Sequence, residues 1–204
     1  EGDVHAAGKK WKEAVAAYRA GLKAAPAATP AATKLHTVLM LSGKQPEADA
    51  WATAWLSDHP KDTAFLAYMG EGSLHARAYK DAERVYRRLV ELSPDNVLAL
   101  NNLAWAMTEL KRPGAVAYAE KATALQPDKP ALMDTLAAAL ASENQLAKAV
   151  EVQRQVVELA PAMPDFRLRL AKLYLQSGQG DKARLGLDQL GKLGGKFKGE
   201  AEVA

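Results

Sequence analysis

The sequence predicts an all-α solenoid built from about five and a half helix-turn-helix repeats. A proline recurs in steps of 34, 34, 33 and 34 residues, and an alanine recurs in steps of 34, 34, 33, 34 and 34. Between these markers, apolar residues follow one another at three- and four-residue intervals, which is the spacing of one face of an α-helix. Several residue types kept in one register over six repeats indicate a repeated structural unit.

Each marker has a physical role in the predicted hairpin. Proline has no N–H and clashes with the preceding turn, so it marks the end of each second helix. These prolines are Pro26, Pro60, Pro94, Pro127 and Pro161. The alanine lets the two helices of a repeat approach closely, and its copies are Ala14, Ala48, Ala82, Ala115, Ala149 and Ala183. The first helix carries a mostly small residue twelve positions earlier, at Gly2, His36, Gly70, Ala137 and Ala171.

The repeats are predicted at residues 1–26, 30–60, 62–94, 95–127, 128–161 and 163–193, followed by a tail at 196–204 that could begin another helix. In the fourth repeat Ala104 lies only eleven residues before Ala115, so we place its single deletion in the turn between the helices. The first repeat lacks the earlier part of its first helix. We therefore expect a fragment of a longer protein, with a frayed start or end-to-end self-association.

Some side chains depart from the repeat pattern. His36 occupies a small slot and Gln153 an apolar one, and we expect both to weaken their interfaces. Trp55 is predicted to be buried, with Trp51 beside it at the flank of the core. His59 precedes a proline in a loop and is predicted to be solvated.

The 34-residue helix-turn-helix period resembles the tetratricopeptide repeat. This resemblance implies a right-handed superhelix whose first helices line a concave groove, and it implies a role in protein–protein interaction. The first-helix residues predicted to point away from the packed faces, and so to contact a partner, are Lys34, Thr37, Tyr68, Glu71, His75, Asn101, Asn102, Trp105, Glu109, Asp134, Arg169 and Lys172.

The pair Asn101 and Asn102, with Trp105 on the same helical face, is the most distinctive of these groups. Side-chain amides both donate and accept hydrogen bonds, so they can pair with the backbone of an extended ligand. Two alternatives remain open from the sequence. An asparagine here can bridge neighbouring repeats, and the tryptophan can be buried between adjacent first helices.

Composition excludes several classes of function. The chain of 204 residues has a net charge of +3 with its cations scattered among acids, which argues against a nucleic-acid partner. It has no cysteine, and no apolar run reaches the roughly 18 residues of a membrane span. The histidines His5, His36, His59 and His75 do not pair at metal-ligand spacing. We therefore expect no enzymatic activity, no cofactor and no metal.

A narrower resemblance concerns the sequence ALNNLAWAMTELKRPGAVAYAEKATALQPDKPALMDTLAAAL and the tail LGGKFKGEAEVA. Both resemble the C-terminal repeats of tetratricopeptide lipoproteins of the PEP-CTERM/exosortase system. This resemblance implies a periplasmic protein attached to the membrane only through a lipid anchor upstream, acting as a scaffold in exopolysaccharide export or protein sorting. The partner is then a protein or an extended peptide. The alternative is direct binding of exopolysaccharide.

Overall fold

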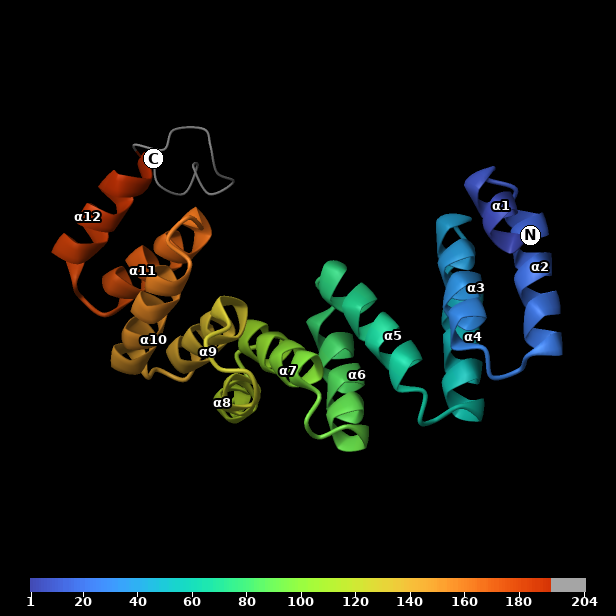
Figure 1. Cartoon of the computed structure of the whole chain (residues 1–204), viewed down its shortest axis with the longest axis horizontal. Coiled ribbons are helices and arrows are strands. Elements are labelled where there is room, and N and C mark those ends of the chain that lie inside the picture. Colours follow the sequence, from blue (N-terminus) through green and yellow to red (C-terminus); the bar gives the residue numbers. More distant parts are fainter. Residues whose placement is uncertain (192–204) are drawn as a thin grey trace. The chain divides into compact units, whose positions relative to one another are not determined.

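The computed structural model describes residues 1–191, and the predicted tail at 196–204 lies outside the described residues (Figure 1). The chain divides into an N-terminal module, Glu1–Gly72, and a C-terminal module that begins at Ser73. The described residues form twelve α-helices and no strand.

The helices come in pairs that correspond to the predicted repeats. They are α1 (Gly2–Ala7) and α2 (Trp11–Ala24), α3 (Thr29–Leu41) and α4 (Gln45–Asp58), α5 (Thr63–His75) and α6 (Tyr79–Leu92), α7 (Val97–Glu109) and α8 (Ala115–Leu125), α9 (Pro130–Ser142) and α10 (Leu146–Leu159), and α11 (Pro164–Gln176) and α12 (Gly180–Gly191). In the C-terminal module α7 packs against α6, α8 and α9, so consecutive hairpins share one continuous core.

The second helices end where the prolines require. The helices α2, α4, α6, α8 and α10 each stop two residues before a recurring proline. The one residue between, such as Ala25 or Ser93, has φ of −135° or −142° and ψ of 81° or 78°. A residue before proline is pushed into this extended region, so the local chemistry of proline sets the helix ends.

A residue in the left-handed conformation reverses the chain between the helices of each pair. These residues are Lys9, Gly43, Arg77, Lys111, Asn144 and Gly178, with φ between 52° and 76°. The second helix begins two residues later in every repeat except the fourth, where Lys111 and Ala115 are four apart. The deletion therefore lies after Lys111. Since α8 also begins later after the turn, it has 11 residues against 14 in α6 and α10.

The shortened start of α8 is capped from the next repeat. The Glu143 carboxylate accepts hydrogen bonds from the backbone N–H groups of Gly114 (2.9 Å) and Val116 (3.2 Å). The first N–H groups of a helix have no partner within the helix, and a negative charge there is favoured by the helix dipole. Glu143 thus ties two neighbouring hairpins together.

The six recurring alanines are the tightest points of the core, and all six are fully buried (0% exposed). The side chains packed around them in the N-terminal module include Leu35, Leu39, Trp55 and Phe65. The prediction that Trp55 is buried and Trp51 flanks it is confirmed. Close packing explains why a side chain larger than a methyl group does not occur at the recurring alanine.

Three departures from the pattern are more firmly held than expected. His36 is buried, and its Nδ1 lies 2.7 Å from the Tyr68 hydroxyl. Gln153 is buried, and its amide donates hydrogen bonds to Asp134 and to the Phe166 carbonyl. The prediction that His59 is solvated is wrong, because its ring stacks on Trp55 with centroids 4.0 Å apart. Each of these side chains has at least one hydrogen-bond partner, which offsets part of the cost of burial, although the Nε2 of His36 is buried without one.

Candidate interaction surface on the first helices

The first helices α7, α9 and α11 of the C-terminal module carry a cluster of polar and aromatic side chains. We call the residues Asn101, Asn102, Trp105, Asp134 and Arg169 the inner cluster. They come from three consecutive repeats, and α7 and α9 are in direct contact. The inner cluster contains five of the twelve predicted partner-contacting residues.

The two asparagines of α7 are in different situations. The Asn102 amide donates to the Tyr86 hydroxyl (2.9 Å) on α6, so it bridges to the preceding repeat. The Asn101 amide donates only a long bond (3.3 Å) to Asn102, and its buried Oδ1 has no hydrogen-bond partner. An unsatisfied buried acceptor costs roughly 1–3 kcal/mol. Asn102 therefore has a structural role, whereas Asn101 retains an unused acceptor.

The prediction that Asp134 points away from the packed faces is wrong, since its side chain is buried, at 6% exposure. Asp134 pairs with the Arg169 guanidinium and accepts a hydrogen bond from Gln153 (3.0 Å) on α10. Burial raises the pKa of Asp134 above its usual value, although Arg169 and Gln153 act in the opposite direction. A buried carboxylate needs such partners, so the ion pair links α9 to α11.

Arg169 also reaches past α9 to α7. Its Cζ lies 5.5 Å from the centre of the Trp105 ring, within the range of a cation–π interaction. The corresponding position of α9 carries Ala138, whose side chain is a single methyl group. The half-buried Trp105 is thus contacted by the first helix two repeats away.

The first helices of the N-terminal module also contact one another through predicted residues. The Lys34 ammonium lies 2.6 Å from the carboxylate of Asp3, which accepts a hydrogen bond from the Tyr18 hydroxyl. Thr37 and Tyr68 are joined by a 2.9 Å hydrogen bond. Sequence reasoning missed Asp3 and Tyr18. The signal was present, because both pairs of first-helix residues are separated by 31 positions.

The remaining predicted residues are exposed. Glu71 and His75 lie on α5, Glu109 on the last turn of α7, and Lys172 on α11. None of them joins the contacts described for the inner cluster. Their predicted role in partner binding remains a prediction.

The sequence and the structure of this chain were compared with those of known proteins. The sequence profile of the tetratricopeptide repeat matches residues 140–196. MamA from Desulfovibrio magneticus RS-1 superposes with a TM-score of 0.70 at 19% identity, covering 81% of this chain and 94% of that chain. YrrB, described as a TPR protein with an unusual peptide-binding site, superposes with a TM-score of 0.70 at 16% identity, covering 91% of this chain and 96% of its own. This chain has the tetratricopeptide-repeat fold.

A sequence relative adds a second comparison. The TPR repeat-containing thioredoxin TTL4 of Arabidopsis thaliana is 37% identical over 70 residues. That match spans 34% of this chain and 10% of the plant protein. The predicted all-α tetratricopeptide-repeat fold is confirmed by the structural likenesses, and proteins with this fold generally act as interaction scaffolds.

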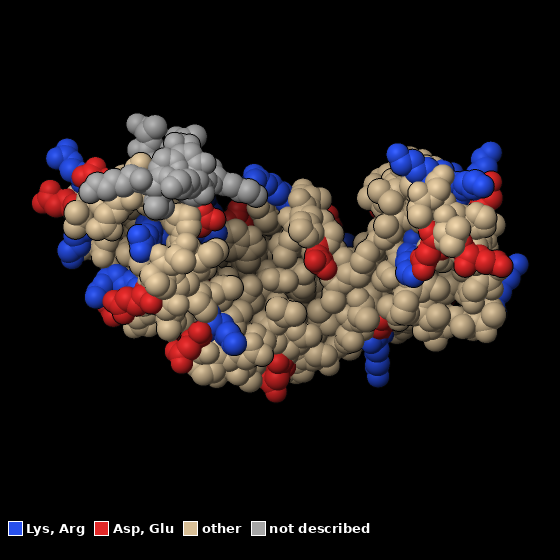
Figure 2. All heavy atoms as spheres, turned by 45° about the horizontal axis from the view of Figure 1, so that its top comes forward, with Lys and Arg blue, Asp and Glu red and all other residues tan. Residues whose placement is uncertain are grey.

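The surface of this tetratricopeptide-repeat solenoid carries mixed charge. On the face drawn in Figure 2, cationic and anionic side chains are interspersed over the described residues. Among residues 1–191 no three His, Asp or Glu side chains are grouped so that they could hold a metal ion. No helix in that range is long and apolar enough to cross a membrane.

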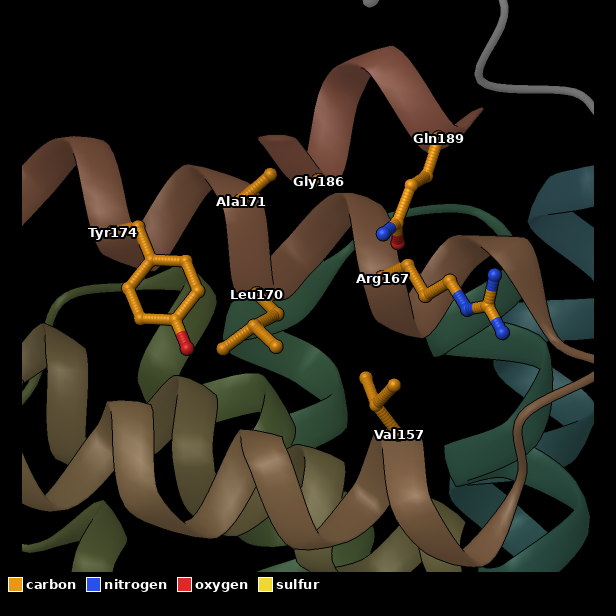
Figure 3. Close-up of a pocket in the computed structure, with 7 residues that line it drawn as sticks. All are labelled: Val157, Arg167, Leu170, Ala171, Tyr174, Gly186 and Gln189. Carbon is orange, nitrogen blue, oxygen red and sulfur yellow. The ribbon is translucent and has the colours of Figure 1, made fainter. Parts of the chain in front are cut away.

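One pocket of about 160 Å³ lies among α10, α11 and α12 (Figure 3). Its lining residues are Val157, Arg167, Leu170, Ala171, Tyr174, Gly186 and Gln189. The inner cluster contributes none of them. The tetratricopeptide-repeat fold here therefore offers two separate features, a polar cluster on the first helices and a mainly apolar pocket between consecutive hairpins.

Proposed function

We propose that this chain is a protein-interaction scaffold whose inner cluster binds an extended segment of a partner protein. The observation that carries the proposal is the Asn101 amide, with its buried, unpartnered oxygen. We propose that this amide rotates on binding, at the expense of its 3.3 Å bond to Asn102, so that the oxygen accepts a hydrogen bond from a main-chain N–H of the ligand. Binding then satisfies an acceptor that the free protein leaves unsatisfied.

The surrounding residues support an extended ligand. Trp105 is half-buried, so one part of its ring remains available for contact with a partner. Arg169 and Asp134 hold each other and leave no isolated buried charge beside the asparagines. A surface fixed by inter-repeat contacts loses little conformational freedom on binding, which allows modest contacts to give useful affinity.

The proposal can be tested with peptides selected from a random library on the wild-type protein. A selected peptide should bind Asn101→Ala and Trp105→Ala about tenfold more weakly. Gln155→Ala is the matched control, because Gln155 is exposed on the second helix α10. If the selected peptides bind Asn101→Ala as tightly as the wild type, with helicity unchanged, the inner cluster does not bind the partner.

The second candidate function is direct binding of exopolysaccharide. A sugar-binding site favours accessible aromatic rings. Tyr68 and Trp105 are the two aromatic residues among the predicted partner-contacting residues. Tyr68 is half-buried and bonded to His36 and Thr37, and Trp105 is half-buried and covered in part by Arg169. These contacts favour a polypeptide ligand. Glycan-array binding that is lost in Trp105→Ala but kept in Asn101→Ala would support the sugar instead.

The biological setting rests on the sequence resemblance alone. We propose that the parent protein is a lipid-anchored periplasmic scaffold in exopolysaccharide export or in PEP-CTERM/exosortase protein sorting. Fractionation of the native cell with an antibody to this chain tests the location. Recovery from the cytoplasm would contradict this setting and leave the scaffold proposal untouched.

A further inference from the structure

The pocket among α10, α11 and α12 is lined by Gly186, at a position where the other repeats carry a side chain. Three residues after the recurring alanine, the six repeats carry Ala17, Trp51, Val85, Tyr118, Val152 and Gly186. Gly186 in α12 is the only glycine among them. A Cβ placed there would lie 3.6 Å from Ala171 Cβ, at ordinary contact distance. The space is therefore an unfilled packing position.

The N-terminal module shows what fits the equivalent position. Trp51 fills it in the second repeat, where its indole N–H donates to the Ala32 carbonyl (3.2 Å) and its ring lies 5.7 Å from Trp55. Ala32 lies four residues before the small slot of α3, and Arg167 lies four residues before the small slot of α11. The same architectural position thus holds an indole in one repeat and is open in the last.

The size and lining of the pocket suit an aromatic ring. Its volume is about 160 Å³, and an apolar cavity of roughly 150 Å³ holds benzene. Val157, Leu170, Ala171 and Tyr174 supply apolar walls. Figure 3 shows Val157 on α10 facing Leu170 on α11, with Tyr174 at one side.

Two cationic side chains lie at the pocket. Arg167 lines it, and none of the ion pairs found among residues 1–191 involves this guanidinium. A second cation, Lys182, lies over the Tyr174 ring, 5.5 Å from its centre. In the part of the chain that the structure describes, no acidic side chain lines the pocket. A peptide with carboxylates next to its aromatic residue is complementary to this site.

We infer that the pocket is a second docking site, which receives an aromatic side chain of a protein partner flanked by acidic residues. The partner's ring takes the place that Trp51 occupies in the second repeat. The flanking carboxylates pair with Arg167 and Lys182. This site lies outside the inner cluster, so it stands or falls independently of the proposed function.

The test uses fluorine NMR with the full chain and the peptide acetyl-Gly-Asp-Glu-Trp-Glu-Asp-Gly-amide, in which the tryptophan is fluorinated. The expected result is a saturable fluorine shift. Gly186→Val installs the residue found at this position in two other repeats, and it should weaken binding by at least about tenfold. Arg167→Gln should weaken binding roughly fivefold, because a partly exposed ion pair contributes up to about 1 kcal/mol.

The controls separate this site from the inner cluster and from loss of folding. Gly21→Ala changes a helical glycine with no neighbour within 4 Å and should bind as the wild type does. Asn101→Ala should also bind as the wild type does. Absence of saturation, equal binding by folded Gly186→Val, or equal binding of a peptide with lysines in place of the acids would each overturn the inference.

Discussion

Replacing Gly186 with alanine should stabilise the last hairpin. Gly186 lies inside α12, and its backbone φ is not in the left-handed region that favours glycine. Among residues 1–191, the added methyl would meet Ala171 alone, at 3.6 Å. An alanine here therefore fills empty space without displacing a neighbour.

The magnitude has two parts. Alanine in place of glycine within a helix is worth roughly 1 kcal/mol, because the unfolded chain has less freedom to lose. Burying one methyl group adds up to about 0.8 kcal/mol. We therefore expect α12 to gain about 1–2 kcal/mol in local unfolding free energy.

The same substitution at two other glycines, Gly21 and Gly2, serves as a comparison for the stability change at Gly186. Gly21→Ala in α2 has no neighbour within 4 Å, so it reports helix propensity alone. Gly2→Ala places a Cβ 2.6 Å from Tyr18 Cε1 and should destabilise α1. The three substitutions are chemically identical, and only their surroundings differ.

Native-state hydrogen exchange is the appropriate assay, because repeats of a solenoid open locally rather than all at once. Amides of α12 should exchange roughly tenfold more slowly in Gly186→Ala, since each 1.4 kcal/mol is a factor of ten. If Gly186→Ala raises the local unfolding free energy of α12 no more than Gly21→Ala raises that of α2, the methyl group added at position 186 makes no stabilising contact. A loss of protection would refute the packing geometry at this position.

Three further substitutions test single contacts. Glu143→Ala removes the cap of α8 and should cost about 0.5–2 kcal/mol, seen as faster exchange of the α8 amides; unchanged exchange would mean that the cap does not contribute. Burial lowers the pKa of His36, so the unfolded chain takes up the proton first and the free energy of unfolding should fall below about pH 6.5. In urea titrations at several pH values, the free energy of unfolding of His36→Ala should change less with pH than that of the wild type. An equally large change in the variant would contradict this prediction. Burial raises the pKa of Asp62, but hydrogen bonds from the Phe65 N–H, Thr29 and Trp55 outweigh it and the pKa lies below its usual value. Its contribution should therefore be lost as the pH falls below about 4, and thermal melts of Asp62→Asn should show a smaller acid-induced loss than the wild type.

The repeat spacing and the helix boundaries could be predicted from the sequence, because both depend on local chemistry. A proline ends a helix wherever it stands, and an alanine at a close approach is needed in every copy of the hairpin. The deletion in the fourth repeat was placed correctly between its helices for the same reason. Its consequence, a shortened α8 capped by Glu143, was not predicted, since the cap comes from the following repeat.

The contacts on the first helices could be predicted only in part. The sequence placed Asn101, Asn102 and Trp105 on one face, but it left open which asparagine bridges repeats. That choice depends on Tyr86, sixteen residues before Asn102, and on the rotamers of both side chains. The sequence predicts that Asp134 points away from the packed faces, but Asp134 is buried and bonded to Gln153 and Arg169, which lie 19 and 35 residues further along the chain.

The sequence by itself determined that this chain is a stack of helical hairpins, since period, proline and alanine act within one repeat. Tertiary structure decided which polar groups are left unsatisfied and where space remains. Arg169 meets Trp105 across two repeats, and the open pocket at Gly186 appears only when α10, α11 and α12 are packed together. Such features depend on the rise and rotation between hairpins, which no single repeat encodes.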